Sequence, residues 1–301
     1  MNFGKRTPEP EALSIVSAAL ERGVTWFDTA NAYTDGASER ILGKALKPHR
    51  DRVQIATKVG FGRISGKPEG LSRTRMLAAI DESLGRLGTD YVDVYYLHVP
   101  DRATPIEESL DAMAALLESK KVRAWGVSNY ASWEILEMMH LADTRGMPRP
   151  VVSQQMYNML IRQLEIEYFR FANKVSLHTT VYNPLAGGLL SGKHTSAGEP
   201  PKGSRFAQNS LYQRRYWSDA MFARVAELSE VAKAAGLTLL ELSYAWTKGR
   251  PGVDSILIGP GTVSHLTDAL DALTKSVDPE TAQRIDSLYK TWEGTDATYA
   301  R

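Results

Sequence analysis

The chain has 301 residues, of which 43% are hydrophobic and 24% charged, enough to bury a core in one large α/β domain or two small ones. Its 36 basic and 35 acidic residues leave a formal net charge of +1, so no overall field attracts nucleic acid or an anionic membrane. The sequence has no cysteine, which excludes disulfides and thiolate chemistry. No apolar run is long enough to cross a bilayer or resembles a signal peptide, so we expect a cytoplasmic protein.

Apolar segments typical of β-strands alternate with segments of helical spacing along the chain. The predicted strands are 24–28, 53–58, 91–98, 125–128, 151–155, 179–182 and 253–258. The predicted helices are 9–22, 38–46, 72–87, 105–120, 132–145, 163–173, 218–235, 239–248, 263–273 and 279–292, with a long loop over 183–217. Thr104 and Glu107, with Pro105 between them, predict a capping box at the start of one helix.

This alternation predicts a parallel sheet covered by helices, in a single domain over residues 1–301. The pattern contains seven strands, one fewer than a closed (β/α)8 barrel needs, and only a stub of a first strand fits before the first helix. We therefore predict a TIM barrel whose first strand is largely missing at the N-terminus, and we attribute the gap to a start site assigned too late. The alternative is a doubly wound sheet, but no G-x-G-x-x-G turn follows the first strand.

Three of the polar residues that end these strands are ionisable, namely Asp28, Lys58 and His98. The carboxyl ends of parallel strands meet at one edge, so we expect these residues to lie together, with Tyr33 of the following loop above them. A tyrosine with a pKa of about 10 is a poor acid at neutral pH unless a cation stabilises its phenolate. Lys58 is a candidate for that cation, Asp28 for its partner, and His98 for a hydrogen-bond donor to a substrate oxygen.

None of these four side chains can supply a hydride. Asn129 and Gln155, which also follow predicted strands, carry amide groups that suit a carboxamide, and Tyr182 offers an aromatic face for a flat ring. Together these residues favour a bound nicotinamide.

The sequence resembles the aldo-keto reductases along almost its whole length. The motifs that carry the resemblance occur in family order and are Phe27-Asp28-Thr29-Ala30-Asn31-Ala32-Tyr33, Ala56-Thr57-Lys58, Leu97-His98, Gly126-Val127-Ser128-Asn129 and Gln154-Gln155. The resemblance implies NADPH-dependent reduction of aldehydes to alcohols by a tetrad of Asp28, Tyr33, Lys58 and His98, with Tyr33 as the general acid. It also implies that the carboxamide is held by Ser128, Asn129 and Gln155, with Tyr182 stacked on the nicotinamide ring.

Later segments are similar to those of the aflatoxin aldehyde and succinic semialdehyde reductases, above all 182–193 and 211–217. This likeness implies that Arg215 and Arg301 bind a carboxylate of the substrate. Gly261 and His265 replace an arginine and a glutamine that are common in the family, so NADH is possible beside NADPH. The further residues that the likeness assigns to the cofactor are Asn183, Leu185, Gly187, Leu189, Lys193, Arg205, Gly259, Gly261 and His265.

Other classes of function are weighed on the same residues. A nicotinamide-binding regulatory subunit with little turnover remains open, because potassium-channel β subunits resemble these reductases. The G-x-x-x-x-G-K run from Gly187 to Lys193 continues with His194, which argues against a P-loop NTPase. The six histidines show no ligand spacing, so no metal site is predicted. We expect a small-molecule carbonyl substrate, no nucleic-acid or membrane partner, and a monomer or homo-oligomer.

Overall fold

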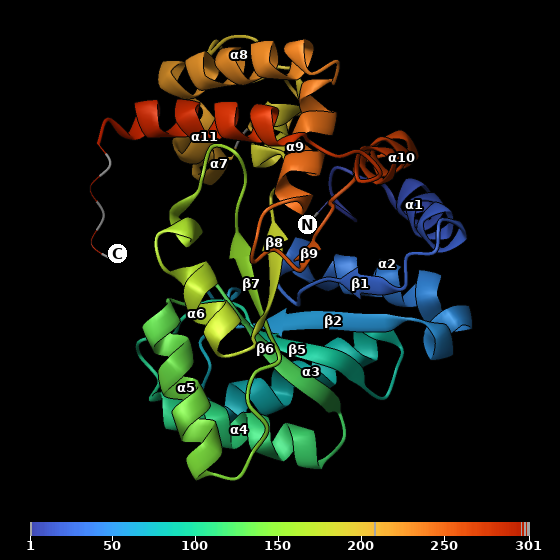
Figure 1. Ribbon diagram of the computed structural model, residues 1–301. Helices are drawn as coiled ribbons and strands as arrows, with labels where there is room; N and C mark the ends of the chain where they lie inside the picture. The colour runs from blue at the N-terminus through green and yellow to red at the C-terminus, as the bar shows by residue number, and fades with distance from the viewer. Residues whose placement is uncertain (1, 208, 296, 298, 300–301) are drawn as a thin grey trace. The chain divides into compact units, whose positions relative to one another are not determined.

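The computed structural model describes residues 2–207, 209–295, 297 and 299, and the chain divides into two compact units (Figure 1). Unit 1 comprises Met1–Gln155, Ser176–His178 and Gly259–Leu266. Unit 2 comprises Met156–Val175, Thr179–Ile258 and Thr267–Arg301. The single domain predicted over residues 1–301 stays a prediction.

Unit 1 alternates strands with helices, as its sequence predicts. Its parallel strands are β1 (Trp26–Asp28), β2 (Gln54–Val59), β5 (Val92–Leu97), β6 (Val122–Ser128) and β7 (Val152–Met156), the last of which ends in unit 2. Its helices are α1 (Glu9–Glu21), α2 (Ala37–Leu46), α3 (Arg73–Leu87), α4 (Ile106–Glu118), α5 (Ser132–Thr144) and the first turn of α10 (Val263–Ala272). Short 3₁₀ turns occupy Tyr33–Gly36 and Lys47–Arg52, and a small antiparallel hairpin joins β3 (Arg63–Ile64) to β4 (Lys67–Pro68).

Neighbouring strands of unit 1 pair in parallel, β1 with β2, β2 with β5, β5 with β6 and β6 with β7. The register sets Asp28 opposite Ala56, Lys58 opposite Tyr96 and Ser128 opposite Gln154. Parallel pairing brings all the carboxyl ends to one edge of the sheet, here named the carboxyl edge, and all the amino ends to the opposite, amino edge. The predicted α/β architecture with parallel strands is therefore confirmed in this unit.

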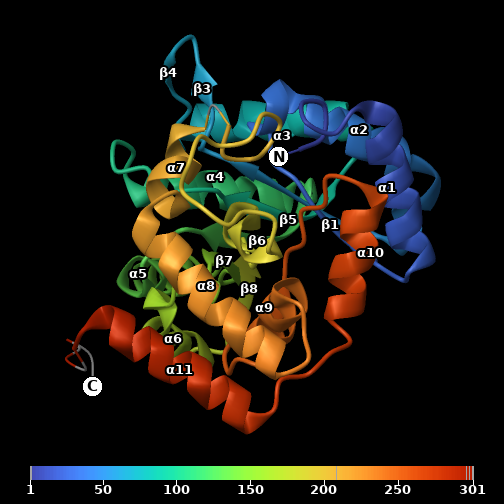
Figure 2. The ribbon, with the colours of Figure 1, turned by 90° about the horizontal axis from the view of Figure 1, so that it is seen from above.

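The two faces of these strands have different surroundings. On one face, here named the inner face, the buried side chains of Ala56, Val94, Tyr96 and Val152 pack together. On the other face, α3 packs against β2 and α4 against β6, and α1 to α5 pack in a row, each against the next (Figures 1 and 2). Because side chains alternate along a strand, the even-numbered positions of these strands share the inner face.

Unit 2 is built mainly of helices around a short parallel pair of strands. The strands are β8 (His178–Tyr182) and β9 (Ser255–Ile256), with Thr180 opposite Ser255. Its helices are α6 (Tyr168–Lys174), α7 (Ser210–Tyr216), α8 (Asp219–Ala234), α9 (Leu239–Lys248), the rest of α10, and α11 (Pro279–Glu293), with 3₁₀ turns at Gln163–Glu165 and Ala186–Ser191. Leu228, Leu242 and Trp246 lie in its buried core. The seven strands in parallel ladders across the described residues match the number predicted.

The predicted capping box at Thr104 is wrong. Helix α4 begins at Ile106, and its N-cap residue, Pro105, makes no side-chain cap. The Thr104 hydroxyl instead donates to the Asp101 carboxylate at 2.7 Å, and Asp101 also accepts from the backbone N–H of Leu71 at 2.8 Å. Thr104 lies one residue before the N-cap position, and proline at that position has no side-chain acceptor, so no cap forms. A capping box is formed instead by Thr238 and Glu241 at the start of α9.

Three predicted segments differ from the structure. The loop 183–217 contains a 3₁₀ turn and helix α7, whose N-cap, Asn209, accepts from the backbone N–H of Tyr212 at 3.3 Å. A helix of seven residues is too short for periodicity to reveal. The predicted helix 163–173 splits into a 3₁₀ turn and α6, and the strand 253–258 shortens to Ser255–Ile256.

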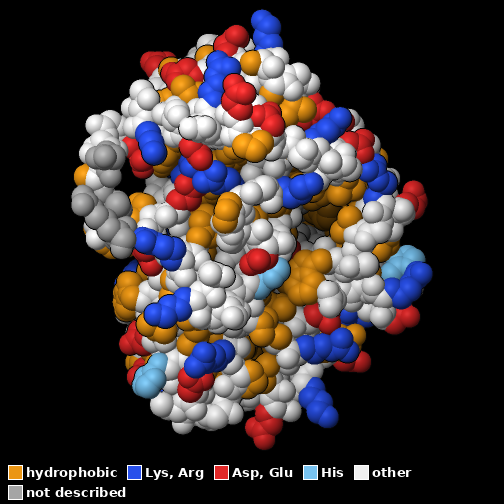
Figure 3. Space-filling model, in the orientation of Figure 1, with side chains coloured by type: hydrophobic (Ala, Val, Ile, Leu, Met, Phe, Trp, Pro, Cys, Tyr) orange, Lys and Arg blue, Asp and Glu red, His pale blue; other side chains and the backbone are white. Residues whose placement is uncertain are grey.

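Basic and acidic side chains are interspersed over the face shown in Figure 3, in keeping with the net charge of +1. In the part of the chain that the structure describes, no helix has the length and apolarity needed to cross a membrane. Within the same residues, no group of three or more His, Asp or Glu side chains is placed to hold a metal ion.

Candidate active site

Four of the predicted residues lie together at the carboxyl edge of unit 1. Asp28 ends β1 and Lys58 lies near the end of β2, where the Lys58 ammonium donates to an Asp28 oxygen in an ion pair and to the carbonyl of Thr29 at 2.9 Å. The Lys58 Nζ lies 5.5 Å from the centroid of the Tyr33 ring. The Tyr33 and His98 rings meet edge to face, with centroids 5.6 Å apart and an angle of 77° between their planes. The structure thus brings together all four members of the predicted tetrad.

The ion pair in this cluster is removed from water. The side chain of Lys58 is 0% exposed and that of Asp28 is 7% exposed. Burial lowers the pKa of Lys58, and the charge and hydrogen bond of Asp28, followed by the charge of Glu39, oppose that change. The second Asp28 oxygen accepts from Gln154 Nε2 at 3.0 Å, so both carboxylate oxygens are held. The cation is therefore fixed beside the Tyr33 ring and loses its proton more readily than an ordinary lysine.

His98 is a buried and neutral imidazole. Burial above all, and then the Lys58 charge, lower the pKa of His98 well below 6.5. Its Nδ1 atom is buried and has no hydrogen-bond partner among the described residues. A neutral imidazole has one donor and one acceptor nitrogen, so His98 can donate a hydrogen bond to a carbonyl oxygen without acting as the acid. The Phe61 ring lies against it, with centroids 5.0 Å apart.

The loop that carries Tyr33 is a strained turn. Thr34 and Asp35, directly after Tyr33, have left-handed backbone with φ of 50° and 52°. Such a conformation costs a non-glycine residue about 1–2 kcal/mol. The turn is held in part by the Thr34 hydroxyl, which donates to the carbonyl of Phe3 at 2.7 Å. Strain at this point indicates that the position of Tyr33 is fixed by its surroundings rather than by local preference.

The residues expected to hold a carboxamide lie on β6 and β7. Asn129, which has a φ of 66°, donates through Nδ2 to the His98 carbonyl at 2.9 Å and to Ser128 Oγ at 3.0 Å. Gln155 donates to the carbonyl of Tyr130 and to Ser153 Oγ, both at 2.9 Å. As an odd-numbered position of β7 it faces the helices, not the inner face. The preceding residue, Gln154, lies on the inner face instead.

In the sequence, Gln154 belongs to the family motif Gln154-Gln155, and the motif alone predicts no role for it. Two structural observations place it in the site: it pairs with Ser128 in the ladder, and it donates to Asp28. The alternation of side chains along β7 indicates the same assignment. Gln154, Lys58 and Ser128 all occupy even-numbered positions, which share the inner face once the strands are aligned.

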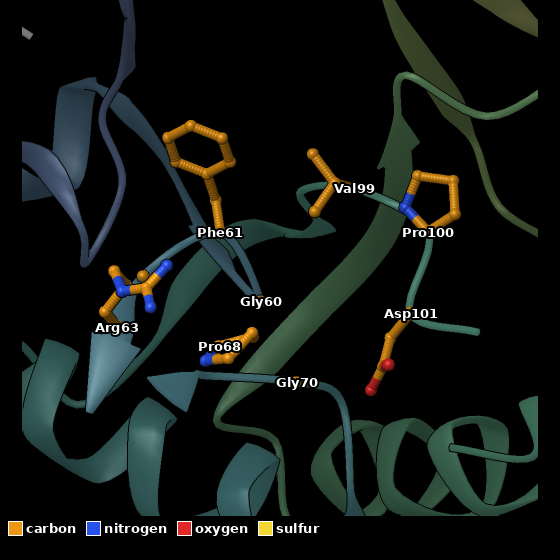
Figure 4. A pocket seen from close by; sticks show the side chains of 9 residues that line it. Gly60, Phe61, Arg63, Pro68, Gly70, Val99, Pro100 and Asp101 are labelled. Carbon is orange, nitrogen blue, oxygen red and sulfur yellow. The ribbon is translucent and has the colours of Figure 1, made fainter. Parts of the chain in front are cut away.

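A cleft opens at the same edge beside Phe61, the residue whose ring lies against His98 (Figure 4). It has a volume of about 260 Å³ and lies between the loop after β2 and the loop after β5. Its apolar lining includes Phe61, Val99 and Pro100, and Arg63 and Asp101 lie on opposite sides of it. The cleft offers an apolar wall next to the imidazole and a charged group at either flank.

In unit 2, Tyr182 ends β8 and is accompanied by Arg215. Burial raises the pKa of Tyr182, and the Arg215 guanidinium, which is hydrogen-bonded to the phenol, opposes that rise. The next residue, Asn183, accepts from the backbone N–H of Gly187 at 2.7 Å and donates to the Tyr216 hydroxyl at 2.7 Å. Two residues with separate predicted roles, Tyr182 and Arg215, are therefore neighbours within unit 2.

The other residues of unit 2 that the likeness assigned to the cofactor are dispersed. Leu185 is half-buried, and Leu189 is buried in the core of unit 2. Lys193 is exposed, and Arg205 donates to the Tyr212 hydroxyl at 3.2 Å. Arg301 lies outside the described residues.

Gly187 needs to be glycine for two reasons. It has a φ of +74°, and an added Cβ would lie 2.7 Å from the Tyr212 ring. Both the conformation and the close approach exclude other residues at this position.

The loop from Gly259 to Gly261 lies in unit 1 against the first residues of the chain. Asn2 donates to the Gly259 carbonyl at 3.2 Å. The first residue of α10, Val263, donates its backbone N–H to the Glu11 carboxylate at 2.9 Å, and His265, two residues on, is exposed. The start of α10 is therefore faced by a carboxylate from α1.

Unit 1 thus has the features of an α/β enzyme with parallel strands, because a buried acid, cation and imidazole meet at the carboxyl edge beside a cleft. The family model described as "Aldo/keto reductase family" matches residues 1–290. The chain belongs to the aldo/keto reductase family and is an oxidoreductase. Members of this family are (β/α)8 barrels that use nicotinamide cofactors, generally NADPH, and act on small carbonyl substrates.

Curated relatives with two kinds of name are similar to this chain. A human protein named "Aflatoxin B1 aldehyde reductase member 2" is 36% identical, over 97% of this chain and 84% of its own. The human "Aldo-keto reductase family 7 member A3" is 34% identical, over 97% of this chain and 92% of its own. An Arabidopsis thaliana protein named "Probable voltage-gated potassium channel subunit beta" is 33% identical, over 91% of this chain and 85% of its own.

Proposed function

We propose that the chain reduces aldehydes to alcohols at the carboxyl edge of unit 1, with NADPH as the cofactor. The observation that carries this proposal is the buried cluster in which Lys58, paired with Asp28, lies 5.5 Å from the Tyr33 ring centroid. Relatives named as aldehyde reductases support it. Aromatic and carboxylate-bearing aldehydes, together with ketones, are the substrates that we expect.

Each side chain of the cluster has a separate task. Tyr33 gives its phenolic proton to the carbonyl oxygen, and the ammonium of Lys58 stabilises the phenolate that remains. Asp28 holds Lys58 in place and, by its charge, keeps the ammonium protonated against the effect of burial. His98, which is neutral, donates a hydrogen bond that orients the carbonyl. A nicotinamide cofactor bound at this edge would supply the hydride for the carbonyl carbon, and the carbonyl oxygen would then take up the proton of Tyr33.

The inner face has groups that suit the carboxamide of such a cofactor. Ser128 and Gln154 are paired neighbours, and the amide of Asn129 lies at the exposed end of the same strand. We assign the carboxamide to these three residues, with Gln154 in place of Gln155. The TIM-barrel architecture of the family is part of this proposal.

The preference between NADPH and NADH depends on Glu11. A carboxylate that faces the start of α10 repels an additional phosphate there and accepts an N–H that would otherwise bind it. We therefore expect a smaller preference for NADPH than a bare helix start would give. The Glu11→Gln variant should raise the ratio of kcat/KM for NADPH to that for NADH, and an unchanged ratio would refute this role.

The substrate's acid group is assigned to Arg215, with Arg301 as the second arginine implied by the resemblance. Arg215 lies next to Tyr182, and a guanidinium binds a carboxylate through two parallel hydrogen bonds. Arg215→Ala is expected to raise the KM for succinic semialdehyde far more than the KM for an uncharged aldehyde of similar size. Equal effects on both substrates would refute the assignment.

The central test is the Tyr33→Phe variant. We expect it to bind NADPH with unchanged affinity, measured by the fluorescence of the cofactor, and to lose about 10²–10⁴-fold in kcat for aldehyde reduction. The wild-type chain is screened first with aldehydes, ketones and quinones, using NADPH and NADH in turn. Full activity in Tyr33→Phe would overturn the mechanism.

A second candidate function is a nicotinamide-binding regulatory subunit on the same fold, favoured by the relative named as a channel β subunit. The two candidates predict different turnover. A chain that binds NADPH tightly but reduces no carbonyl in the screen would support the regulatory role.

A further inference from the structure

We propose that Glu69 is a positioning residue for the carbonyl reduction, through a carboxylate clamp that joins the loop carrying Tyr33 to the loop that follows Lys58. The clamp is defined here as Glu69 with its partners Asn31, Gly60, Gly62 and Arg75. Glu69 lies between β4 and α3, and its side chain is 2% exposed. This inference rests on the proposed function, because it assigns Glu69 a task at the same site.

One oxygen of the clamp fixes the residues on both sides of Phe61. Glu69 Oε2 accepts from the backbone N–H of Gly60 at 2.8 Å and of Gly62 at 3.3 Å. The backbone N–H of Glu69 donates in turn to the Gly62 carbonyl at 2.9 Å. With both neighbours held, Phe61 is kept against the His98 ring even though its own side chain is 51% exposed.

The other oxygen holds the loop between Asp28 and Tyr33. Glu69 Oε1 accepts from Asn31 Nδ2 at 2.6 Å, and Asn31 lies two residues before Tyr33. The backbone N–H of Asn31 also donates to the Lys58 carbonyl at 3.2 Å. One carboxylate therefore links the segment of the proton donor to the segment that carries the wall of the cleft.

The carboxylate of the clamp accepts as many hydrogen bonds as it can, and its charge is paired with a cation. Glu69 Oε1 also accepts from Arg75 Nε at 3.0 Å, which brings the number of donors to four. Four is about the number of lone-pair sites that a carboxylate offers. Arg75 also binds Glu82, which is 45% exposed and touches neither loop. The buried charge of Glu69 is thus paired with Arg75. Its three other hydrogen bonds hold the two loops.

The sequence around Phe61 is shaped for this contact. A Cβ added to Gly62 would lie 3.2 Å from Glu69 Oε2, closer than most Cβ contacts. Gly60 has a φ of +106°, and an added Cβ would lie 2.7 Å from the Leu71 side chain. Gly62 lets the backbone approach the carboxylate, and Gly60 supplies the positive φ and the close approach to Leu71, so the clamp depends on the Gly-Phe-Gly sequence as well as on Glu69.

The Glu69→Gln variant tests the clamp with little change in shape. A carboxamide has one acceptor oxygen and one donor nitrogen, so it cannot accept from the Phe61 loop and from Asn31 together. We expect kcat for aldehyde reduction to fall at least tenfold, while the affinity for NADPH stays within twofold of the wild type. The matched control is Glu82→Gln, which removes the other carboxylate of Arg75 and should keep kcat within twofold.

A rescue variant distinguishes positioning from a general loss of stability. In the Asn31→Asp/Glu69→Gln double variant, the amide at position 69 can donate to the carboxylate at position 31 while its oxygen still accepts from Gly60 and Gly62. We expect kcat to return to within threefold of the wild type. The clamp is overturned if Glu69→Gln and Glu82→Gln lose activity equally, or if the double variant is as slow as the single one.

Two further measurements keep the test decisive. If Glu69→Gln does not fold, Asn31→Ala severs only the link to the Tyr33 loop and should lower kcat at least threefold. An unchanged kcat overturns the proposal.

If the wild type reduces no carbonyl, the proposed function fails by itself. The clamp is then tested through the NMR signals of the His98 ring. These signals should shift in Glu69→Gln and not in Glu82→Gln, because Phe61 lies against His98; equal spectra overturn the clamp.

Discussion

The two edges of the parallel strands in unit 1 each bury a carboxylate against a cation, but they use it differently. At the amino edge, the cluster is Arg50, Tyr91, Asp93 and Arg123, here named the amino-edge cluster. Asp93 accepts from Arg50 at 2.9 Å, from the backbone N–H of Ile55 at 2.9 Å and from Arg123 at 3.0 Å. The Arg50 and Arg123 guanidinium carbons also lie 3.9 Å and 3.7 Å from the centroid of the Tyr91 ring.

At the carboxyl edge, the ion pair of Lys58 and Asp28 lies near a buried hydrogen-bonding atom that none of the described residues contacts through a hydrogen bond. The His98 Nδ1 is buried without a partner among the described residues, and left-handed backbone follows Tyr33. The donors and acceptors of the amino-edge cluster hold strands together, whereas this ring nitrogen at the carboxyl edge has none of the described residues as a partner. A buried polar group without a partner marks the edge where a ligand has to be bound.

The largest expected effect is a loss of activity when the ion pair of Asp28 and Lys58 at the carboxyl edge is replaced by neutral side chains. The Asp28→Asn/Lys58→Met double variant is expected to lose about 10³-fold in kcat/KM, which corresponds to about 4 kcal/mol. Its free energy of unfolding should equal or exceed that of the wild type, because replacing a buried ion pair with neutral groups is often neutral or stabilising. Aldehyde-dependent NADPH consumption and urea denaturation measure the two quantities.

The single variant Asp28→Asn is the control for that experiment. It leaves Lys58 buried without its counter-charge and should destabilise the chain by about 3 kcal/mol. A double variant that is as unstable as the single one would show that the carboxyl edge also serves stability, and the contrast between the edges would fail.

The next largest effect is a loss of stability when the carboxylate of the amino-edge cluster is removed. Asp93→Asn places an amide donor against two guanidinium groups and a backbone N–H, and should lower the free energy of unfolding by about 3 kcal/mol. Its kcat should stay within twofold of the wild type. The control is Asp81→Asn, which breaks an ion pair with Lys121 whose side chains are 59% and 39% exposed, and should cost at most about 0.5 kcal/mol. A large loss of kcat in Asp93→Asn would contradict the division of tasks.

A smaller loss of stability is expected as the pH falls. It arises because the carboxyl edge buries a neutral histidine, whereas the amino-edge cluster contains no histidine. In the unfolded chain His98 has its ordinary pKa of about 6.5, whereas burial holds the pKa of the folded state well below that value. Between the two values only the unfolded chain binds the proton. The stability from neutral His98 is therefore complete above about pH 6.5 and is lost as the pH falls, by up to about 1.4 kcal/mol per unit.

Urea denaturation of the wild type and of His98→Gln at several pH values between 5 and 8 measures this contribution. The variant has no proton to bind at position 98 and should lose stability less steeply on the acid side. Parallel slopes for the two proteins would show that His98 is not the group responsible.

The smallest effect compares two left-handed residues, one at each edge. Lys120, in the connection before β6, has a φ of 61°, and Asn129, directly after β6, has a φ of 66°. Lys120→Gly should stabilise the chain by about 1 kcal/mol without changing kcat, since glycine adopts this conformation freely. Asn129→Gly relieves the same conformation but removes an amide assigned to the carboxamide, so it should weaken NADPH binding. Equal NADPH affinity in both variants would contradict the role of Asn129.

Much of unit 1 could be predicted because its strands and helices are long and regularly spaced. Nine helix predictions, including those around α2, α3 and α4 of this unit, agree with the structure to within a residue or two at each end. The tetrad followed from the same regularity, since parallel strands deliver their terminal residues to one edge. Short elements such as α7, and caps such as that of α4, were missed because they depend on which partner a single side chain finds.

The face on which a residue lies was harder to predict than its strand. Gln154 and Gln155 are the same residue type in the same strand, and only the register with Ser128 shows which of them faces Asp28. Glu69 gave no signal at all, because its partners lie 38, 9 and 7 residues away in the chain.

The sequence by itself determined the parallel α/β architecture of unit 1 and the identity of the acid, the cation and the imidazole, because periodicity and strand ends are local properties. Only the tertiary structure decided the electrostatic state of these groups. Burial lowers the pKa values of Lys58 and His98, and it depends on everything packed around them. The choice of Gln154, the clamp of Glu69 and the carboxylate at the start of α10 likewise come from contacts between distant segments, which only the folded chain brings together.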